Sequence, residues 1–271
     1  MRKFELNARQ ILYLASLSGA TEFIGIPDGF YGMDELEIKQ EIMDIQSELE
    51  QKGYAEADFD GDFTPHADIM QDIKLCSACA KFISVEKAGQ GEPSSEVLFY
   101  IQKNQVIKIE GNMGNYILTH IELSEIQPDI LTHINWSTPG AVGSSEESTV
   151  ISTDVLLKIK QKNSGEFSEE SAKAELKKMG CSDRQVQIIC DGLTAKAAYY
   201  SVIMIDFTHE ESKMDSIMII NAEAGALEMI PGDGSRENVV NFMNIDYETF
   251  KNRLNHSLGR LRVWEGDGDL V

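Results

Sequence analysis

The sequence has no apolar run long enough to cross a membrane, and it is poor in positive charge, proline and cysteine. Its 271 residues include 45 acidic and 24 basic residues, which gives a formal net charge of −21. A surface of this sign repels phosphate backbones and anionic lipid, so we expect no binding to nucleic acid or to membrane surfaces. The lack of a long apolar run predicts no membrane insertion. Hydrophobic residues make up 42% of the chain, which is enough for the core of one large domain or of two small ones.

Motifs that carry catalysis are also missing. The sequence contains no His-Glu-x-x-His pair, no phosphate-binding loop with its lysine and no Gly-x-Ser-x-Gly elbow. The glycine-rich segments at residues 231–237 and 265–269 are acidic, which makes them poor phosphate cradles and favours turns. We therefore expect no enzymatic activity, no catalytic residue, no bound metal and no cofactor.

The four cysteines favour a reducing compartment and buried thiols. Cys76 and Cys79 have the spacing of a redox pair, but they fall near the end of a predicted helix, whereas a thioredoxin-type pair begins one. Cys181 and Cys190 are too far apart to complete a zinc site of familiar spacing. We therefore interpret the cysteines as small core residues.

The first 20 residues have some features of a signal peptide, but polar residues interrupt their apolar stretch early. Asn7 and Gln10 have the spacing of a capping box, which predicts the start of a helix at this point. We interpret the segment as a retained first helix, and we expect the protein to be cytoplasmic.

Three aspartates at alternate positions raise the question of a calcium loop. In a loop that begins at Asp58, glycine is needed at the sixth position and glutamate at the twelfth, but Gly61 is fourth and Ile69 is twelfth. Asp60 and Gly61 instead form a favourable turn pair. We therefore predict a turn between two helices, with Asp58, Asp60 and Asp62 free of metal.

The order of predicted elements is the same in two parts of the chain. In each part three helices precede an antiparallel meander of four strands, and one helix follows it, so the sequence predicts an α+β fold with two related halves. We place the N-terminal half at residues 1–136, an exposed and protease-sensitive linker at 137–149, the C-terminal half at 150–260 and an acidic tail at 261–271.

Caps and apolar periodicity predict where these elements begin and end. The third helix starts with Thr64 as N-cap and Pro65 as first helical residue, Pro128 opens the fourth, and Gly259 ends the last. The helices are predicted at residues 7–17, 34–52, 64–80, 128–136, 154–162, 168–179, 182–193 and 246–258, and the strands at 81–86, 96–102, 106–111, 115–122, 199–207, 216–222, 226–231 and 238–245.

Several short motifs occur in an order that resembles a known family. They are "ILYLASLSG", "GIPDG", "LEQKGY" and "DGDFTPHADIM" in the first half, and "YYSVIMIDF", "SIMIINAEAGALEMIP" and "DYETFKNRLNHSL" in the second. Together they resemble the EspG family of type VII secretion (ESX) proteins and their uncharacterised relatives in other Gram-positive bacteria. The resemblance covers nearly the whole chain as a pattern of elements.

The resemblance implies a mixed α/β fold with quasi-twofold halves around a central sheet. It also implies a cytosolic, non-catalytic chaperone or adaptor that holds an elongated helical secretion substrate until the secretion ATPase takes it. The partner would be a small helical-hairpin secreted protein or the helical targeting domain of an LXG toxin, with the ATPase as a further contact. An immunity protein that neutralises a secreted toxin fits the acidic composition equally well, and an enzyme would need a convergent polar pocket.

The segment "KAGQGEPSSE", residues 87–96, is predicted as a long loop between the first two strands. Loops longer than a tight hairpin requires are often binding sites. In proteins that resemble this one, the region lies near the bound substrate. The predicted partner-binding residues are Lys87, Gly89, Gln90, Gly91, Glu92 and Pro93.

Overall fold

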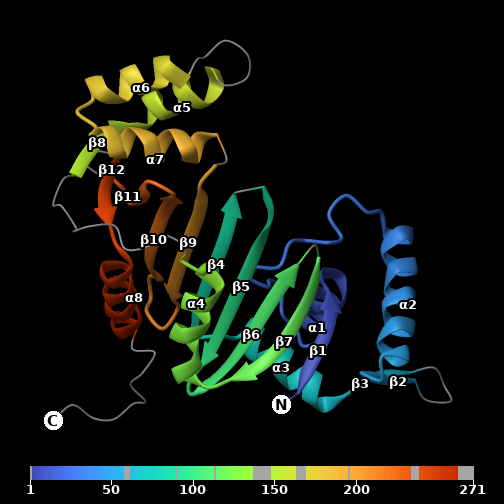
Figure 1. Ribbon diagram of the computed structural model, residues 1–271. Helices are drawn as coiled ribbons and strands as arrows, with labels where there is room; N and C mark the ends of the chain where they lie inside the picture. The colour runs from blue at the N-terminus through green and yellow to red at the C-terminus, as the bar shows by residue number, and fades with distance from the viewer. Residues whose placement is uncertain are drawn as a thin grey trace, which may run out of the picture.

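The computed structural model of the protein describes residues 2–57, 62–89, 91–112, 114–136, 148–162, 169–194, 196–232 and 238–261. Its first half contains an edge strand, three helices, a small hairpin, a four-stranded meander and a closing helix (Figure 1). These elements are β1 (Lys3–Asn7), α1 (Ala8–Leu17), α2 (Glu35–Gln51), β2 (Ala55–Ala57), β3 (Phe63–Pro65), α3 (Ala67–Ser77), β4 (Lys81–Gly89), β5 (Glu92–Gln102), β6 (Gln105–Asn112), β7 (Asn115–Ile121), the 3₁₀ turn η1 (Leu123–Glu125) and α4 (Ile126–Ile134).

The second half repeats this order without the small hairpin. None of the described helices is both long and apolar enough to span a membrane. The elements are β8 (Ser148–Ser152), α5 (Thr153–Lys162), α6 (Glu169–Lys178), α7 (Asp183–Leu193), β9 (Ala198–Asp206), β10 (Lys213–Ala222), β11 (Gly225–Pro231), β12 (Val239–Ile245) and α8 (Tyr247–Arg260).

The two meanders join in one ten-stranded antiparallel sheet, in the order β1-β7-β6-β5-β4-β9-β10-β11-β12-β8. The first strand of each meander lies at the centre, where β4 and β9 pair from Lys81–Asp206 to Gly89–Ala198. The edge strands β1 and β8 each pair with the last strand of their own meander. This arrangement confirms the predicted α+β fold with two related halves.

The closing helices α4 and α8 cover one face of the sheet. Phe250, Leu254 and Leu258 of α8 are buried in the same core as Ile130 of α4 and apolar residues of the central strands. The opposite face has two separate cores, one under α1 and α3 in the first half and one under α6 and α7 in the second. The core under the closing helices is therefore built from both halves, whereas the helices on the opposite face cover one core in each half.

Caps are found at several of the predicted helix ends. Asn7 and Gln10 form a reciprocal capping box at α1, and Ser182 and Gln185 form another at α7. Gly53 follows α2 with a φ of +68°, a left-handed conformation that glycine adopts without steric cost.

Other predicted boundaries are wrong. Thr64 and Pro65 lie in β3, where they pair with β2, so α3 begins later, at Ala67, and its N-cap His66 makes no side-chain capping bond. Pro128 is the third residue of α4, because the helix continues from η1. Ala80 is not helical, since its backbone bonds to Ile101 and Phe207 extend β4.

Both ends of the second half also differ from the prediction. Residues 148 and 149 belong to β8, so the predicted linker overlaps a strand, and residues 137–147 lie outside the described part. Gly259 lies inside α8, which ends at Arg260. Leu261 is 5% exposed and packs in the core, so it does not belong to the predicted tail, whose other residues, 262–271, are not described.

Candidate functional site

The predicted loop at residues 87–96 is instead the tip of a tight hairpin. Lys87 and Gly89 end β4, Glu92 and Pro93 begin β5, and Gly89 pairs with Glu92. Only Gln90, which lies outside the described residues, and Gly91 separate the strands. Residues 87–96 therefore do not form the predicted long loop. The described residues among those predicted to bind the partner do lie together at the end of this hairpin.

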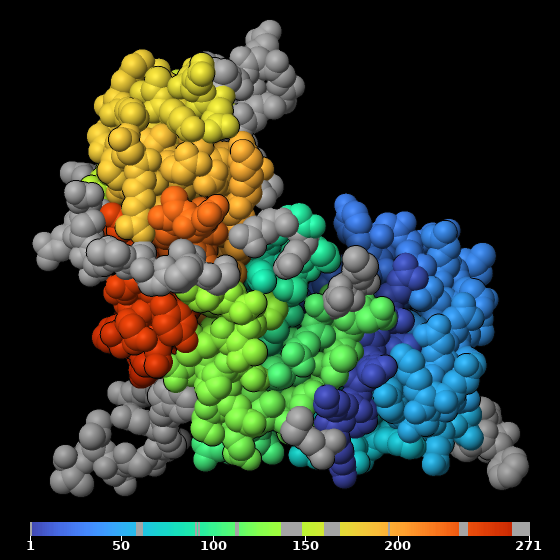
Figure 2. Space-filling model, in the orientation of Figure 1, coloured from blue at the N-terminus to red at the C-terminus, as the bar shows by residue number. Residues whose placement is uncertain are grey.

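The strand extends this far because β4 has a partner on each side. Ala88 and Gly89 continue the pairing with β9, opposite Tyr199 and Ala198. A Cβ atom at Gly89 would lie 2.4 Å from the carbonyl oxygen of Ala197, so this close approach requires glycine. Figure 2 shows the hairpin tip beside a broad notch between the helices of the second half and α2. Contact of these residues with a partner stays a prediction.

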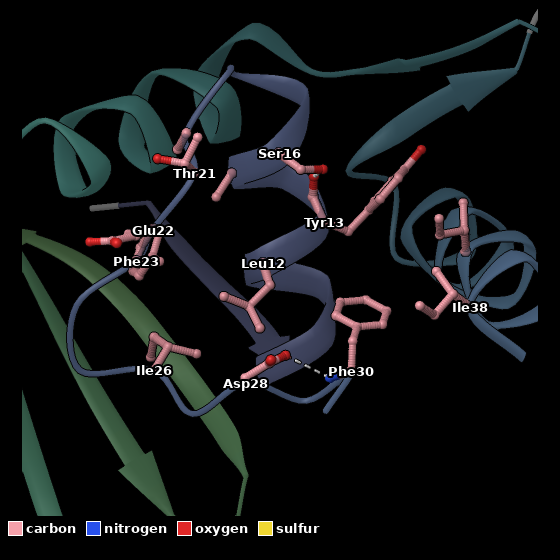
Figure 3. A pocket seen from close by; sticks show the side chains of 13 residues that line it. Leu12, Tyr13, Ser16, Thr21, Glu22, Phe23, Ile26, Asp28, Phe30 and Ile38 are labelled. Atoms are coloured by element: carbon pink, nitrogen blue, oxygen red, sulfur yellow. Dashed lines mark hydrogen bonds between the residues drawn. The ribbon is translucent and has the colours of Figure 1, made fainter. Parts of the chain in front are cut away.

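A second candidate site is an open apolar pocket in the first half, which we call the α1–α2 groove. Its volume is about 510 Å³, and it lies between α1, the connection at residues 18–34 and the N-terminal half of α2. Figure 3 shows Leu12 at its centre, with Phe23 and Ile26 on one side and Phe30 and Ile38 on the other. A pocket of this size and composition can hold several apolar side chains of a partner.

The groove is open because α2 is packed over only half of its length. Apolar periodicity points Ile38, Ile42, Ile45 and Leu49 to one side of this helix. Ile45 and Leu49 are buried, whereas Ile38 and Ile42 are half-buried and line the groove. The N-terminal half of the apolar stripe on α2 therefore has room for another partner.

Polar contacts anchor α2 at its C-terminal half. Gln46 Nε2 donates to the hydroxyl of Tyr13 (2.6 Å), and Glu48 Oε2 accepts from Gln10 Nε2 (2.6 Å). Lys52 Nζ donates to the Oε1 atom of Gln10 at 3.1 Å. Gln46, Glu48 and Lys52 lie beyond Ile38 and Ile42 along the chain, although Tyr13 itself lines the groove, so these contacts hold α2 without closing the groove.

The opposite wall of the groove is fixed to the central sheet. The hydroxyl of Tyr100 donates to the carbonyl oxygen of Ile24 (2.5 Å). Gly25 has a φ of +80°, and a Cβ atom there would lie 2.9 Å from Leu98. The connection therefore passes close to β5 in a conformation that favours glycine, which makes this wall a preformed surface.

The rim of the groove is acidic. Glu22 and Asp28 are among its lining residues. The nearby cation of Arg9 is already engaged, because its Nε donates to the carbonyl oxygen of Gly29 (2.8 Å) and its Nη1 pairs with Glu41 (2.8 Å). The field at the rim therefore favours positively charged groups on a partner.

The titratable groups elsewhere have the properties of structural residues. All four cysteines are free, and burial raises the pKa of Cys79 and of Cys181 to about 11, so these thiols stay protonated and are poor nucleophiles. Asp72 on α3 is buried beside His120 of β7 (2.6 Å), and burial raises the pKa of its carboxyl despite that contact. Among the described residues, no His, Cys, Asp and Glu side chains form a group of three or more that could hold a metal ion.

Sequence reasoning did not identify the groove. Leu12, Phe23, Ile26, Phe30 and Ile38 belong to no motif that marks a binding site. The available signal was the apolar and aromatic content of residues 20–34, which is high for a connection between two helices.

The sequence matches no protein-family model and no curated protein. The fold, however, is similar to that of EspG5, a type VII secretion system chaperone from Mycobacterium tuberculosis, in its structure in complex with the PE25–PPE41 dimer. The two chains align with a TM-score of 0.61 over 99% of each chain, at 10% sequence identity. At this identity the similarity concerns the fold, because proteins of one fold can differ in function. The chain thus has an EspG-like fold over its whole length.

Proposed function

We propose that the protein is a cytosolic, non-catalytic chaperone or adaptor of a type VII secretion system. The observation that carries this proposal is the similarity of fold to the chaperone EspG5 over 99% of both chains. Because the match includes both halves and their helices, it involves more than a common sheet architecture. An open apolar groove with an acidic rim is also better suited to holding a protein partner than to performing a reaction.

The proposed partner is a secreted helical protein, either a small helical hairpin or the targeting domain of an LXG toxin, with the secretion ATPase as a further contact. The proposed contact surface includes the tip of the β4–β5 hairpin, with Lys87, Gly89, Gln90, Gly91, Glu92 and Pro93. Its position beside the notch between the two sets of helices supports this choice (Figure 2).

Co-purification of the tagged protein from its native host, followed by mass spectrometry, tests the proposal. We expect a secreted helical protein to co-purify in stoichiometric amount. Capture of a toxin domain without a helical targeting domain would instead identify an immunity protein. Absence of any secreted helical protein from host cells that express the secretion system would contradict the chaperone proposal.

The hairpin tip is best tested by side-chain substitutions, because removal of residues 88–94 would also remove strand pairs with β9. Lys87→Glu combined with Pro93→Glu should weaken binding of the captured partner by about tenfold. Lys103→Glu, in the turn at the other end of β5, is the matched control and should leave affinity unchanged. Equal affinity of all three proteins would remove the hairpin tip from the contact surface.

A further inference from the structure

Apolar side chains form most of the lining of the α1–α2 groove, and its neighbouring segments carry further exposed apolar residues. Ten large apolar side chains are exposed in the described part of the chain, and five of them fall between residues 17 and 43. This segment contains the connection and the N-terminal half of α2, which are the elements that form the groove. The five exposed residues do not line the groove themselves, but an open pocket with a mostly apolar lining is typical of a protein-binding site.

The shape of the groove suits a helix. One wall presents Ile38 and Ile42, one turn apart on α2, and the floor presents Leu12 and Ser16, one turn apart on α1. Ridges with a spacing of four residues accept the side chains of another helix. An amphipathic helix would place apolar residues at i, i+4 and i+7 between these rows.

The charges around the groove define the flanks of such a helix. Besides Glu22 and Asp28, the first turn of α2 begins with exposed Asp34, Glu35 and Glu37. Exposed Lys39 is the one cation in this stretch of α2, and Arg9 is engaged with Glu41. Positively charged residues beside an apolar stripe would complement this rim, whereas acidic residues would be repelled.

We propose that the α1–α2 groove binds one amphipathic helix whose apolar stripe is flanked by lysine or arginine. The proposal names a surface for the helical partner and so rests on the proposed function. The hairpin tip and the groove are then separate contact surfaces. The apolar side chains provide affinity, and the acidic rim selects basic helices and accelerates their association.

A designed peptide tests the groove without knowledge of the native partner. The probe is a lactam-bridged 16-residue helix (about four turns) with leucine at i, i+4, i+7 and i+11 and lysine on both flanks. Titration calorimetry measures affinity, and amide chemical shifts of the isotopically labelled full chain locate the site. We expect shifts concentrated in residues 12–42, and about tenfold weaker binding when glutamate replaces the lysines.

Matched variants separate the groove from non-specific apolar binding. Ile38→Ser should weaken binding by about tenfold, whereas Met214→Ser, which also removes an exposed apolar side chain, should not. Glu22→Lys with Glu35→Lys leaves the apolar lining intact and should reverse the preference between lysine and glutamate peptides. This charge variant keeps the test valid even if Ile38→Ser fails to fold.

Equal binding by wild type and both groove variants would overturn the proposal, as would peptide-induced shifts outside residues 12–42. These results would leave the proposed function in place if a secreted helical protein still co-purifies from the host. Conversely, the peptide could bind as expected while no secreted helical protein co-purifies from the host. That result would contradict the chaperone role and support the groove as a helix-binding site.

Discussion

The two halves of the protein share a scaffold but differ in the helices on one face of the sheet. In the second half, α6 packs on α7, and α7 covers β10 and β11, with Leu176, Val186 and Ile189 buried between them. In the first half, α2 is only partly packed and leaves the α1–α2 groove open. The meander and its closing helix are alike in both. The difference between the halves is thus concentrated in the helices that precede each meander, where it leaves a groove open without disturbing the sheet.

The closing helices of the two halves have the same position but differ in the charges that join them to the sheet. Each is joined to the third strand of its meander by an ion pair, but the charges are exchanged. Arg253 of α8 contacts Glu228 of β11 (2.5 Å), whereas Asp129 of α4 contacts Lys108 of β6 (2.7 Å). The same place in the topology is stabilised by opposite arrangements of charge, which indicates that the position of the contact matters more than its polarity.

The most damaging test of the shared scaffold is Phe250→Ala in α8. Phe250 is fully buried and stacks on Trp136 from the first half, with ring centroids 5.4 Å apart. Its removal should lower the free energy of unfolding by about 3–5 kcal/mol, and Ile130→Ala in α4 by about 2–5 kcal/mol. Urea unfolding followed by circular dichroism measures both values.

The same experiment tests whether the halves unfold together. Because β4 and β9 pair along their whole length, both variants should keep a single transition. Separation into two transitions would show that the halves are independently stable, which contradicts a cooperative central sheet.

The difference between the two ends of α2 predicts the next effect. Ile45→Ala removes a buried side chain and should cost about 2–5 kcal/mol of unfolding free energy, while Ile38→Ala, on the same apolar stripe, should cost about 1 kcal/mol or less. Thermal denaturation of the two variants compares them directly. A cost at Ile38 equal to that at Ile45 would mean that the groove is closed by α2 itself in solution.

The exchanged ion pairs should differ in strength and pH dependence. Burial raises the pKa of Glu228 above its usual range, and Arg253 opposes this. A carboxyl whose pKa is raised on folding costs stability as the pH rises through that pKa, so Arg253→Met should be more harmful at about pH 7 than at about pH 5.

At about pH 7 we expect a loss of about 1–2 kcal/mol, below the value for a fully buried pair because the Arg253 side chain is 40% exposed. Lys108→Met should cost about 0.5 kcal/mol, since it leaves Asp129 and Glu110 accessible to water. Denaturant unfolding at both pH values provides the comparison. Equal losses for Arg253→Met at the two pH values would contradict the role given to Glu228.

A further small effect concerns the caps of the closing helices. Asp246 accepts from the backbone N–H of Thr249 at the start of α8, whereas the N-cap of α4, Glu125, makes no side-chain capping bond. Asp246→Ala should therefore lower the free energy of unfolding by about 1 kcal/mol. Glu248→Ala removes a carboxylate of the first turn that does not cap the helix, and it should cost only about 0.3 kcal/mol.

Hydrogen bonds from Thr249 lower the pKa of Asp246. Its contribution should therefore be present above the ordinary aspartate pKa and be lost as the pH falls through the lower folded value, below about pH 4. Thermal unfolding of wild type and Asp246→Ala should converge in that acidic range. A constant difference between them would show that the cap acts without its charge.

Local signals predicted most of the helices and all eight meander strands, because caps and apolar periodicity act within one element. The edge strands β1 and β8 escaped prediction because each has only five residues and leads directly into a helix, without a turn between them. Non-local contacts decided the rest. The end of β4 depends on its pairing with β9, and the groove depends on how far α2 stands from α1, neither of which a local pattern encodes.

The position of β1 and β8 at the two ends of the sheet has a consequence for self-association. Both present one unpaired edge in the described part of the chain. In β1, the exposed side chains of Lys3 and Glu5 oppose the addition of another strand, since charged residues protect sheet edges. In β8, no residue is charged, and Val150 is 42% exposed. The free edge of β8 is therefore the weaker barrier against edge-to-edge aggregation at high protein concentration.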